Sequence, residues 1–118
     1  MQVIKLNNCA RIIAPDDAVA QEWISPRNSR AQAQSLAKIY IAAGVTVLEH
    51  HHIQTEEVYF ILSGKGMMFL QGEWKAVHPG DAVVILPGER HSIRNEGPEE
   101  LVMHVTCCPP WTPEDQIF

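Results

Sequence analysis

Residues 44–64 read GVTVLEHHHIQTEEVYFILSG, and this stretch decides the fold. His50 and His52 are two positions apart, so on a β-strand both side chains leave the same face, with their Cα atoms ~6.6 Å apart. Glu57 then opens a second run of strand character, Val58–Leu62. Imidazole and carboxylate groups are side chains that bind divalent metals. The stretch therefore predicts two β-strands that direct metal-binding side chains toward a common point.

The strand pattern extends in both directions from this stretch. Short apolar runs alternate with turns such as His78–Asp81 and Pro87–Arg90, which is typical of an all-β sandwich or barrel. The predicted strands are Ser35–Ala42, Val45–His52, Glu57–Leu62, Met67–Gln71, Trp74–Val77, Ala82–Leu86, His91–Asn95 and Leu101–Cys108. One short helix, with a simple turn as the alternative, is predicted over Pro15–Glu22, because Pro-Asp-Asp is a favourable first turn.

The size and charge of the chain exclude several classes of protein. At 118 residues it is expected to form one domain with a single core. Its net charge is −5 and it has no basic run, so nucleic acid is not an expected partner. Its apolar runs are far shorter than the ~20 residues that span a bilayer, so no membrane partner is expected. The first residues lack a charged and then apolar leader, which predicts a cytoplasmic location.

Within the single domain, three regions differ in pattern. Residues 1–34 are expected to form an N-terminal arm, residues 35–108 the β-barrel, and residues 109–118 a C-terminal tail whose prolines cannot continue a central strand. The cysteines at positions 9, 107 and 108 do not form a disulfide framework, since two of them are adjacent. We interpret them as small apolar residues of a reduced protein.

A fourth candidate ligand, His91, follows the Pro87–Arg90 turn at the start of another predicted strand. Three imidazoles and one carboxylate leave coordination positions open on a metal that prefers five or six ligands, which indicates a working site more than a structural one. His51 belongs to the opposite strand face and His78 to a turn, so both are interpreted as surface residues.

The spacing of these residues resembles the two signature motifs of the cupin superfamily. The first motif is matched by Gly44, His50, His52, Glu57 and Gly64. The second motif is matched by Gly80, Pro87, Gly88, His91 and Asn95. The sequence departs from the second motif at Leu86, where the family has a proline.

The resemblance implies a double-stranded β-helix, or jelly-roll barrel, that holds one divalent transition metal. The implied ligands are His50, His52, Glu57 and His91, and the metal is Zn, Fe, Mn, Ni or Cu. Glu56 is an alternative to Glu57, because a glutamate three residues after His52 also satisfies the family's looser spacing. The step of six intervening residues from Glu57 to Gly64 favours Glu57.

Two further residues are candidates for catalysis as proton donors. Tyr59 shares the strand face of Glu57, although a tyrosine of the core with a hydrated hydroxyl fits the same pattern. His104 lies in Leu101–Cys108, and the pattern there does not decide which face is turned inward.

Two functions are compatible with the resemblance. The first is a metal-dependent enzyme of the dioxygenase, decarboxylase, lyase or isomerase type, acting on a small oxygen-rich molecule such as an organic acid or a sugar. The second is a non-catalytic module that binds such a molecule through the metal. The choice depends on the site, because the fold hosts many chemistries.

In the predicted strand Glu57–Leu62, the side chains on the face opposite Glu57 bear on assembly. Val58, Phe60 and Leu62 are all apolar and must be covered, either by the N-terminal segment Val3–Leu6 or by a partner subunit. Exposed apolar stripes usually mark interfaces, so a homodimer is predicted.

Overall fold

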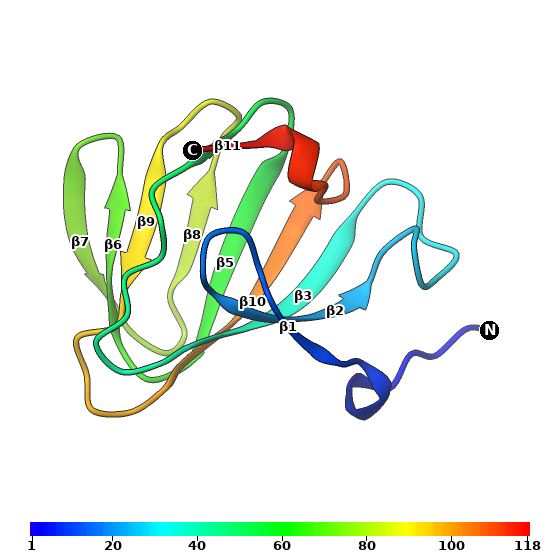
Figure 1. The fold of residues 1–118 in the computed structure, drawn as a ribbon, viewed down its shortest axis with the longest axis horizontal. Helices are drawn as coiled ribbons and strands as arrows, with labels where there is room; N and C mark the ends of the chain where they lie inside the picture. The colour runs from blue at the N-terminus through cyan, green and yellow to red at the C-terminus, as the bar shows by residue number, and fades with distance from the viewer.

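The computed structural model describes residues 1–118, and it is built almost entirely of β-strands (Figure 1). The strands are β1 Arg11–Ile13, β2 Val19–Ile24, β3 Ser35–Ile41, β4 His51–His52, β5 Glu56–Ser63, β6 Gly66–Leu70, β7 Glu73–Val77, β8 Ala82–Ile85, β9 His91–Arg94, β10 Leu101–Cys108 and β11 Gln116–Ile117. Two short 3-10 helices, η1 Leu6–Asn8 and η2 Pro113–Asp115, complete the elements. Neither has the length and apolar character that a bilayer-crossing helix needs.

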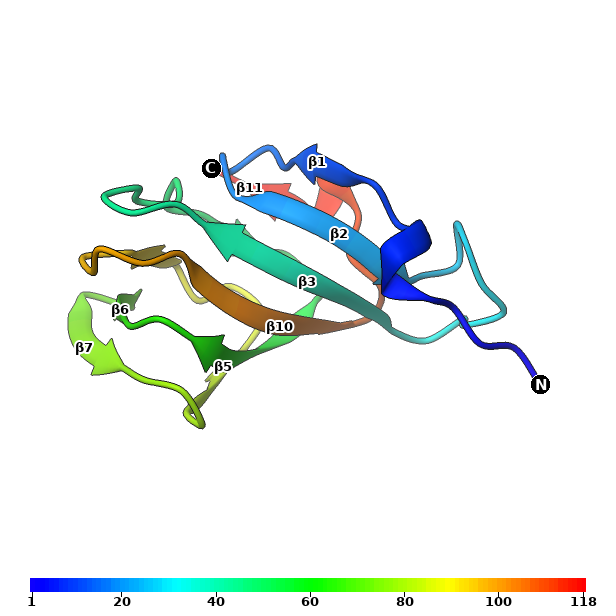
Figure 2. The same ribbon diagram turned by 90° about the horizontal axis from the view of Figure 1, so that it is seen from below.

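The strands form two main antiparallel sheets and one small ribbon. The larger sheet has the order β1-β2-β3-β10-β5-β8, and the smaller has the order β7-β6-β9. Figure 2 shows β2, β3, β10 and β5 as one curved layer, with β6 and β7 beside its lower end. The bridges Thr46↔Arg94 and His50↔His91 prolong the smaller sheet toward β4, which pairs with β11. The predicted all-β jelly-roll fold is thereby confirmed, although the sheets do not close.

The core lies between the two sheets, and strand β10 shows how it is formed. β10 pairs with β3 on one side and with β5 on the other. Its residues alternate, and Leu101, Met103, Val105 and Cys107 are the buried set. Successive side chains of a strand point to opposite faces, so the intervening set, which includes His104, lies on the outer face of the sheet. This settles the question that the sequence pattern left open for β10.

The helix predicted over Pro15–Glu22 is absent, and that prediction was wrong. The segment forms a turn and then enters β2, which pairs with β3 in the register Val19↔Tyr40 and Ala20↔Ile39. Local propensity for a helical first turn is a weak preference, and the pairing of a strand with buried neighbours outweighs it. Strands β1 and β2 thus extend the larger sheet from within the N-terminal 34 residues.

The loop after β9 is fastened by one buried side chain. The Asn95 amide donates hydrogen bonds to the carbonyls of Ile41 (2.9 Å) and Glu99 (2.7 Å), and its oxygen accepts one from the Gly97 amide (3.0 Å). The chain then returns into β10 close beside the turn at Gly64. A Cβ at Gly64 would lie 2.6 Å from the carbonyl oxygen of Glu100, and the residue has a positive φ of 78°. Only glycine satisfies both conditions without strain.

Candidate metal centre

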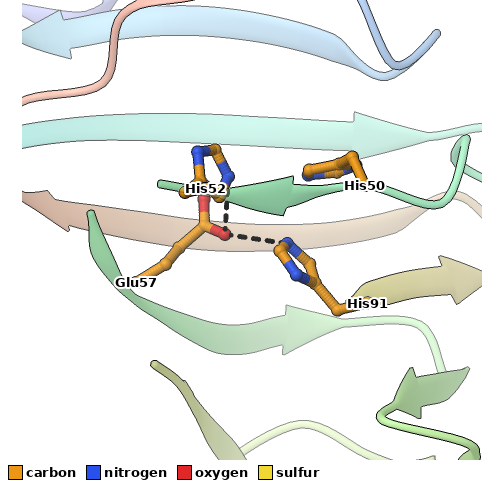
Figure 3. Close-up of side chains that lie close together, drawn as sticks. All are labelled: His50, His52, Glu57 and His91. Carbon is orange, nitrogen blue, oxygen red and sulfur yellow. Dashed lines mark ion pairs between the residues drawn. The ribbon is translucent and has the colours of Figure 1, made fainter. Parts of the chain in front are cut away.

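Four side chains converge in the space between the sheets (Figure 3). His50, His52, Glu57 and His91 each direct one ligand atom into the cluster, and these atoms all lie within 4.8 Å of one another. All four residues are buried, and none is more than 5% exposed. The structure thus brings together the four residues that the sequence spacing singled out.

Backbone pairing explains why these side chains meet. His50 and His91 form an isolated antiparallel bridge, with N–H···O distances of 3.1 and 2.8 Å in the two directions. His52 follows at the end of β4, and its carbonyl accepts a hydrogen bond of 2.7 Å from the Gly88 amide, which lies in the turn before β9. Glu57 comes from β5, in the larger sheet. The cluster therefore joins three separate segments of the chain.

The orientation of two imidazoles is fixed by backbone carbonyls. Nδ1 of His50 lies 2.7 Å from the carbonyl of Leu48, and Nδ1 of His91 lies 2.9 Å from that of Glu89. A carbonyl only accepts, so Nδ1 must carry the proton, and Nε2 presents its lone pair to the cluster. A hydrogen bond from the other ring nitrogen to a carbonyl is what orients histidines for metal binding.

The third imidazole, His52, lies beside the C-terminal tail without a hydrogen bond to it. Its Nδ1 lies 3.9 Å from Oδ2 of Asp115, and its Nε2 lies 3.4 Å from Oε1 of Glu57. The Asp115 carboxylate is itself held by the backbone amides of Gln54 (2.9 Å) and Thr55 (3.1 Å). Sequence reasoning missed Asp115, because nothing in the tail indicates that it folds back beside β4.

The protonation states of the cluster suit a divalent cation. Burial, and after it the neighbouring His91, lowers the pKa of His50 to about 4, so this ring is neutral at pH 7. Burial raises the pKa of Glu57, but the His52 and His91 rings lower it by more, to about 2. Neutral imidazoles and an ionised carboxylate are the forms that ligate metals.

Three atoms of the cluster have no hydrogen-bond partner although they are buried: Nε2 of His52, Oε1 of Glu57 and Nε2 of His91. Oε1 of Glu57 lies 3.1 Å from Nε2 of His91, but the contact lacks hydrogen-bond geometry. Unsatisfied buried polar atoms are costly and rare, and here they face one another. A divalent transition metal among them would satisfy all three, so the residues present fit such an ion.

Three other residues that the sequence offered as ligands, or as neighbours of ligands, lie outside the cluster. Glu56 is exposed at the start of β5, and Glu57, not Glu56, belongs to the cluster. His51 points away from the cluster, with Nδ1 3.4 Å from Nη1 of Arg90. His78 is exposed in its turn beside Asp81.

Of the two catalytic candidates, Tyr59 lies beside the cluster. It is buried, and its ring centroid is 6.0 Å from that of His91. Burial, and then the negative charges of Glu57 and Asp16, raise the pKa of Tyr59 well above its usual value. The phenol therefore keeps its proton at neutral pH and can act as a hydrogen-bond donor.

The structure does not bring His104, the other catalytic candidate, to the cluster. Its side chain belongs to the outer set of β10 and packs edge-on against Trp23, with ring centroids 5.6 Å apart. The alternation of side chains along a strand places it on the face opposite Met103 and Val105, which line the cavity described next. We therefore assign His104 no role in the site.

A cavity of about 110 Å³ is lined by three of the four candidate ligands, His50, His52 and Glu57. A single water occupies only ~10–15 Å³ on this scale, so the cavity has room for a small molecule. Asp16, which the sequence assigned to a helix, lies at its wall with Oδ2 4.0 Å from Nε2 of His50. Burial is the main reason that the pKa of Asp16 is raised. No sequence signal linked Asp16 to the histidines.

Comparison with known proteins agrees with this geometry. The family model described as "Cupin domain" matches residues 38–107. An uncharacterized protein of Methanocaldococcus jannaschii is 35% identical over 105 residues, covering 87% of this chain and 82% of that protein. The oxalate-binding protein of Thermotoga maritima is 33% identical over 70 residues, covering 59% of this chain and 58% of that protein.

Solved structures share the fold. The crystal structure of a predicted oxalate decarboxylase from Thermotoga maritima has a TM-score of 0.80 at 22% identity, covering 92% of this chain and 99% of that one. At this identity the likeness concerns the fold alone.

Proposed function

The chain belongs to the cupin family, and on that premise we propose that it is a metal-dependent enzyme acting on a small oxygen-rich molecule. The single observation that carries the proposal is the set of buried, unpartnered ligand atoms of His52, Glu57 and His91, which lies beside a cavity. A structural metal site fills its coordination sphere with protein ligands and has no reason to adjoin a cavity. A site with open positions is what a metal needs in order to bind a substrate.

The residues around the cavity would have distinct roles in such a reaction. His50, His52, Glu57 and His91 would hold the ion, which supplies Lewis-acid stabilisation of a negatively charged oxygen on the bound molecule. Tyr59 keeps its phenol proton and lines the same cavity, so it is placed to donate a hydrogen bond to that molecule. Hydrophobic neighbours limit the access of water, which strengthens each of these electrostatic contacts.

The comparisons favour an organic acid over a sugar as the class of bound molecule. The Thermotoga maritima relative is described as oxalate-binding, and oxalate is a small acid that ligates metals through oxygen. A carboxylate oxygen is also the type of ligand that an open position on a divalent transition metal accepts.

The same relative supports a second candidate function, a module that binds a small acid through the metal without converting it. The two functions differ in one measurement. A small acid that raises the melting temperature of the metal-loaded protein and yields no product after long incubation would favour the binding module, whereas product formation would favour the enzyme.

The metal centre itself is tested by elemental analysis of purified variants. We expect His50→Ala and His91→Ala each to abolish metal retention, because each removes an imidazole whose Nε2 faces the cluster. Their circular dichroism should still be that of a folded β-protein. His78→Ala, in an exposed turn, is the control and should retain the metal. Full metal content in either of the first two variants would refute the proposal.

A further inference from the structure

The wall of the cavity beside the metal centre is dominated by hydrophobic side chains. Thirteen of its 20 lining residues are hydrophobic, and strands β1, β2 and β3 contribute Ile12, Ala20, Ala37 and Ile39. On the β10 side, Met103 and Val105 continue the same surface. Beyond the candidate ligands that line the cavity, most of the contact offered to a bound molecule is therefore apolar.

The charged groups of the wall are all acidic. Asp16 and Glu22 line the cavity together with the ligand Glu57, and no lysine or arginine is among the lining residues. Arg27 lies at the edge of the cavity, but its guanidinium already donates hydrogen bonds to other residues of the chain. Its Nε lies 2.9 Å from Oε1 of Glu22, and its Nη2 donates to the carbonyl of Trp111 at 2.9 Å. The cavity thus offers no free cation to a bound anion.

The charge balance at the ion limits how much negative charge a ligand can bring. The three histidines are neutral ligands, and Glu57 cancels one of the two positive charges of a divalent ion. One positive charge remains, enough for one anionic group. A second carboxylate on the same molecule would lie against apolar side chains or beside Asp16 and Glu22, which offer it no positive charge. Burial of an unpaired charge in such surroundings is strongly unfavourable.

Resting on the proposed function, we propose that this site selects molecules with one anionic metal-binding end and an uncharged, apolar remainder, and that it discriminates against dicarboxylates. An aliphatic remainder gains free energy by leaving water for the wall formed by Ile12, Ile39 and Met103. A terminal carboxylate loses its hydration there and finds no partner. Like the oxalate that the Thermotoga maritima relative is described as binding, such a molecule would reach the ion through a carboxylate, but it carries no second one.

Two matched probes test this directly. 2-Oxopentanoate and 2-oxoglutarate have the same five-carbon length and the same 2-oxo acid end, and they differ only in a methyl group against a second carboxylate. Calorimetric titration of the Zn²⁺-loaded protein should show 2-oxopentanoate binding at least about 10-fold more tightly. Equal or tighter binding of 2-oxoglutarate would overturn the inference, and so would the failure of both acids to bind.

A variant of the wall tests the physical cause. Glu22→Gln removes one acidic group and frees Arg27. We therefore expect the ratio of the dissociation constants of 2-oxoglutarate and 2-oxopentanoate to fall severalfold. Glu56→Gln removes an equally charged but exposed residue outside the cavity and should leave the ratio unchanged. An unchanged ratio in Glu22→Gln would contradict the electrostatic explanation.

Metal content measured on the same samples separates the two proposals. Stoichiometric zinc together with tight 2-oxoglutarate binding would overturn the ligand preference alone. Loss of zinc from the wild-type protein during dialysis would overturn the proposed function, and the preference with it.

Discussion

At the scale of single residues, the metal centre is prepared by groups that do not belong to it. The carbonyls of Leu48 and Glu89 each accept a hydrogen bond from Nδ1–H of a histidine. Asp115 lies beside the third ring, and the thiol of Cys107 lies 3.5 Å from Oε2 of Glu57. The hydrogen bonds to His50, His91 and Glu57 orient these side chains before any ion binds. Such preorganisation lowers the cost of assembling the site.

The buried neutral state of His50 leads to a prediction about acid stability. Its pKa is about 4 in the folded protein and 6.5 in its ordinary state, so between these values the unfolded chain binds a proton that the folded chain does not. The free energy of unfolding of the metal-free protein should therefore fall as pH falls from 6.5 to 4, by about 2–3 kcal/mol from this group. Urea denaturation after chelation of the metal measures this loss.

His50→Gln provides the comparison for the acid prediction, because glutamine does not titrate. Its unfolding free energy should decrease less over the same pH range than that of the wild-type protein. An equal decrease in both proteins would show that His50 does not cause the loss.

At the scale of elements, the C-terminal segment is part of the site. Strand β11 pairs with β4 in the register Gln116↔His52, and the Asp115 carbonyl accepts a 3.0 Å hydrogen bond from the amide of Ile53. Gln116 reaches the cavity wall from this strand. The residues predicted to form a tail therefore support the loop that carries His52, as well as covering the cavity.

The turn at Gly64 gives a prediction with an internal control. Gly64→Ala should destabilise the protein by about 2–4 kcal/mol, because the residue needs a positive φ and its Cβ would meet the Glu100 carbonyl. Gly72 also has a positive φ, of 85°, but nothing lies within 4 Å of a Cβ built there, so Gly72→Ala should cost only about 1–2 kcal/mol. Urea denaturation compares the two. Equal losses would mean that the close approach at Gly64 is relieved by a small backbone shift.

At the scale of the whole molecule, the outer face of the larger sheet lacks a cover. Phe60 is 44% exposed on β5 and Val84 is 56% exposed on β8, and the two strands are paired. The N-terminal segment lies elsewhere, since the Ile4 carbonyl accepts a 2.8 Å hydrogen bond from Trp23 on β2. The sheet order separates β2 from β5 by two strands. The segment is thus not placed over the stripe, and we propose that a second copy of the chain covers it.

Assembly is tested by light scattering at micromolar concentration. We expect the wild-type protein to be a homodimer and the double variant Phe60→Glu, Val84→Glu to be a monomer, because two buried like charges would oppose association. Val3→Glu changes an apolar residue that is 72% exposed in the N-terminal segment beside β2, two strands away from β5, and should leave the dimer intact. A monomeric wild-type protein would contradict the proposal.

The sequence by itself determined the fold and the composition of the candidate site. Period-two alternation predicted that His50 and His52 share a face, and turn residues divided the chain into strands close to those observed, such as Ser35–Ala42 for β3. The choice between Glu56 and Glu57 was also predictable, because the step from Glu57 to Gly64 fits the family motif. These features depend on spacing along the chain, which is local information.

Only the tertiary structure decided which distant segments complete the site. The inward face of β10, which excludes His104, follows from its pairing with β3 and β5. Asp16 and Asp115 reach the histidines because β2 and β11 join sheets whose partners lie far away in sequence. Pairing energies of this kind outweigh local propensity, as the missing helix at Pro15–Glu22 shows. These energies depend on contacts between residues far apart in the sequence, and a local pattern of apolar and polar residues does not predict which distant residues pair.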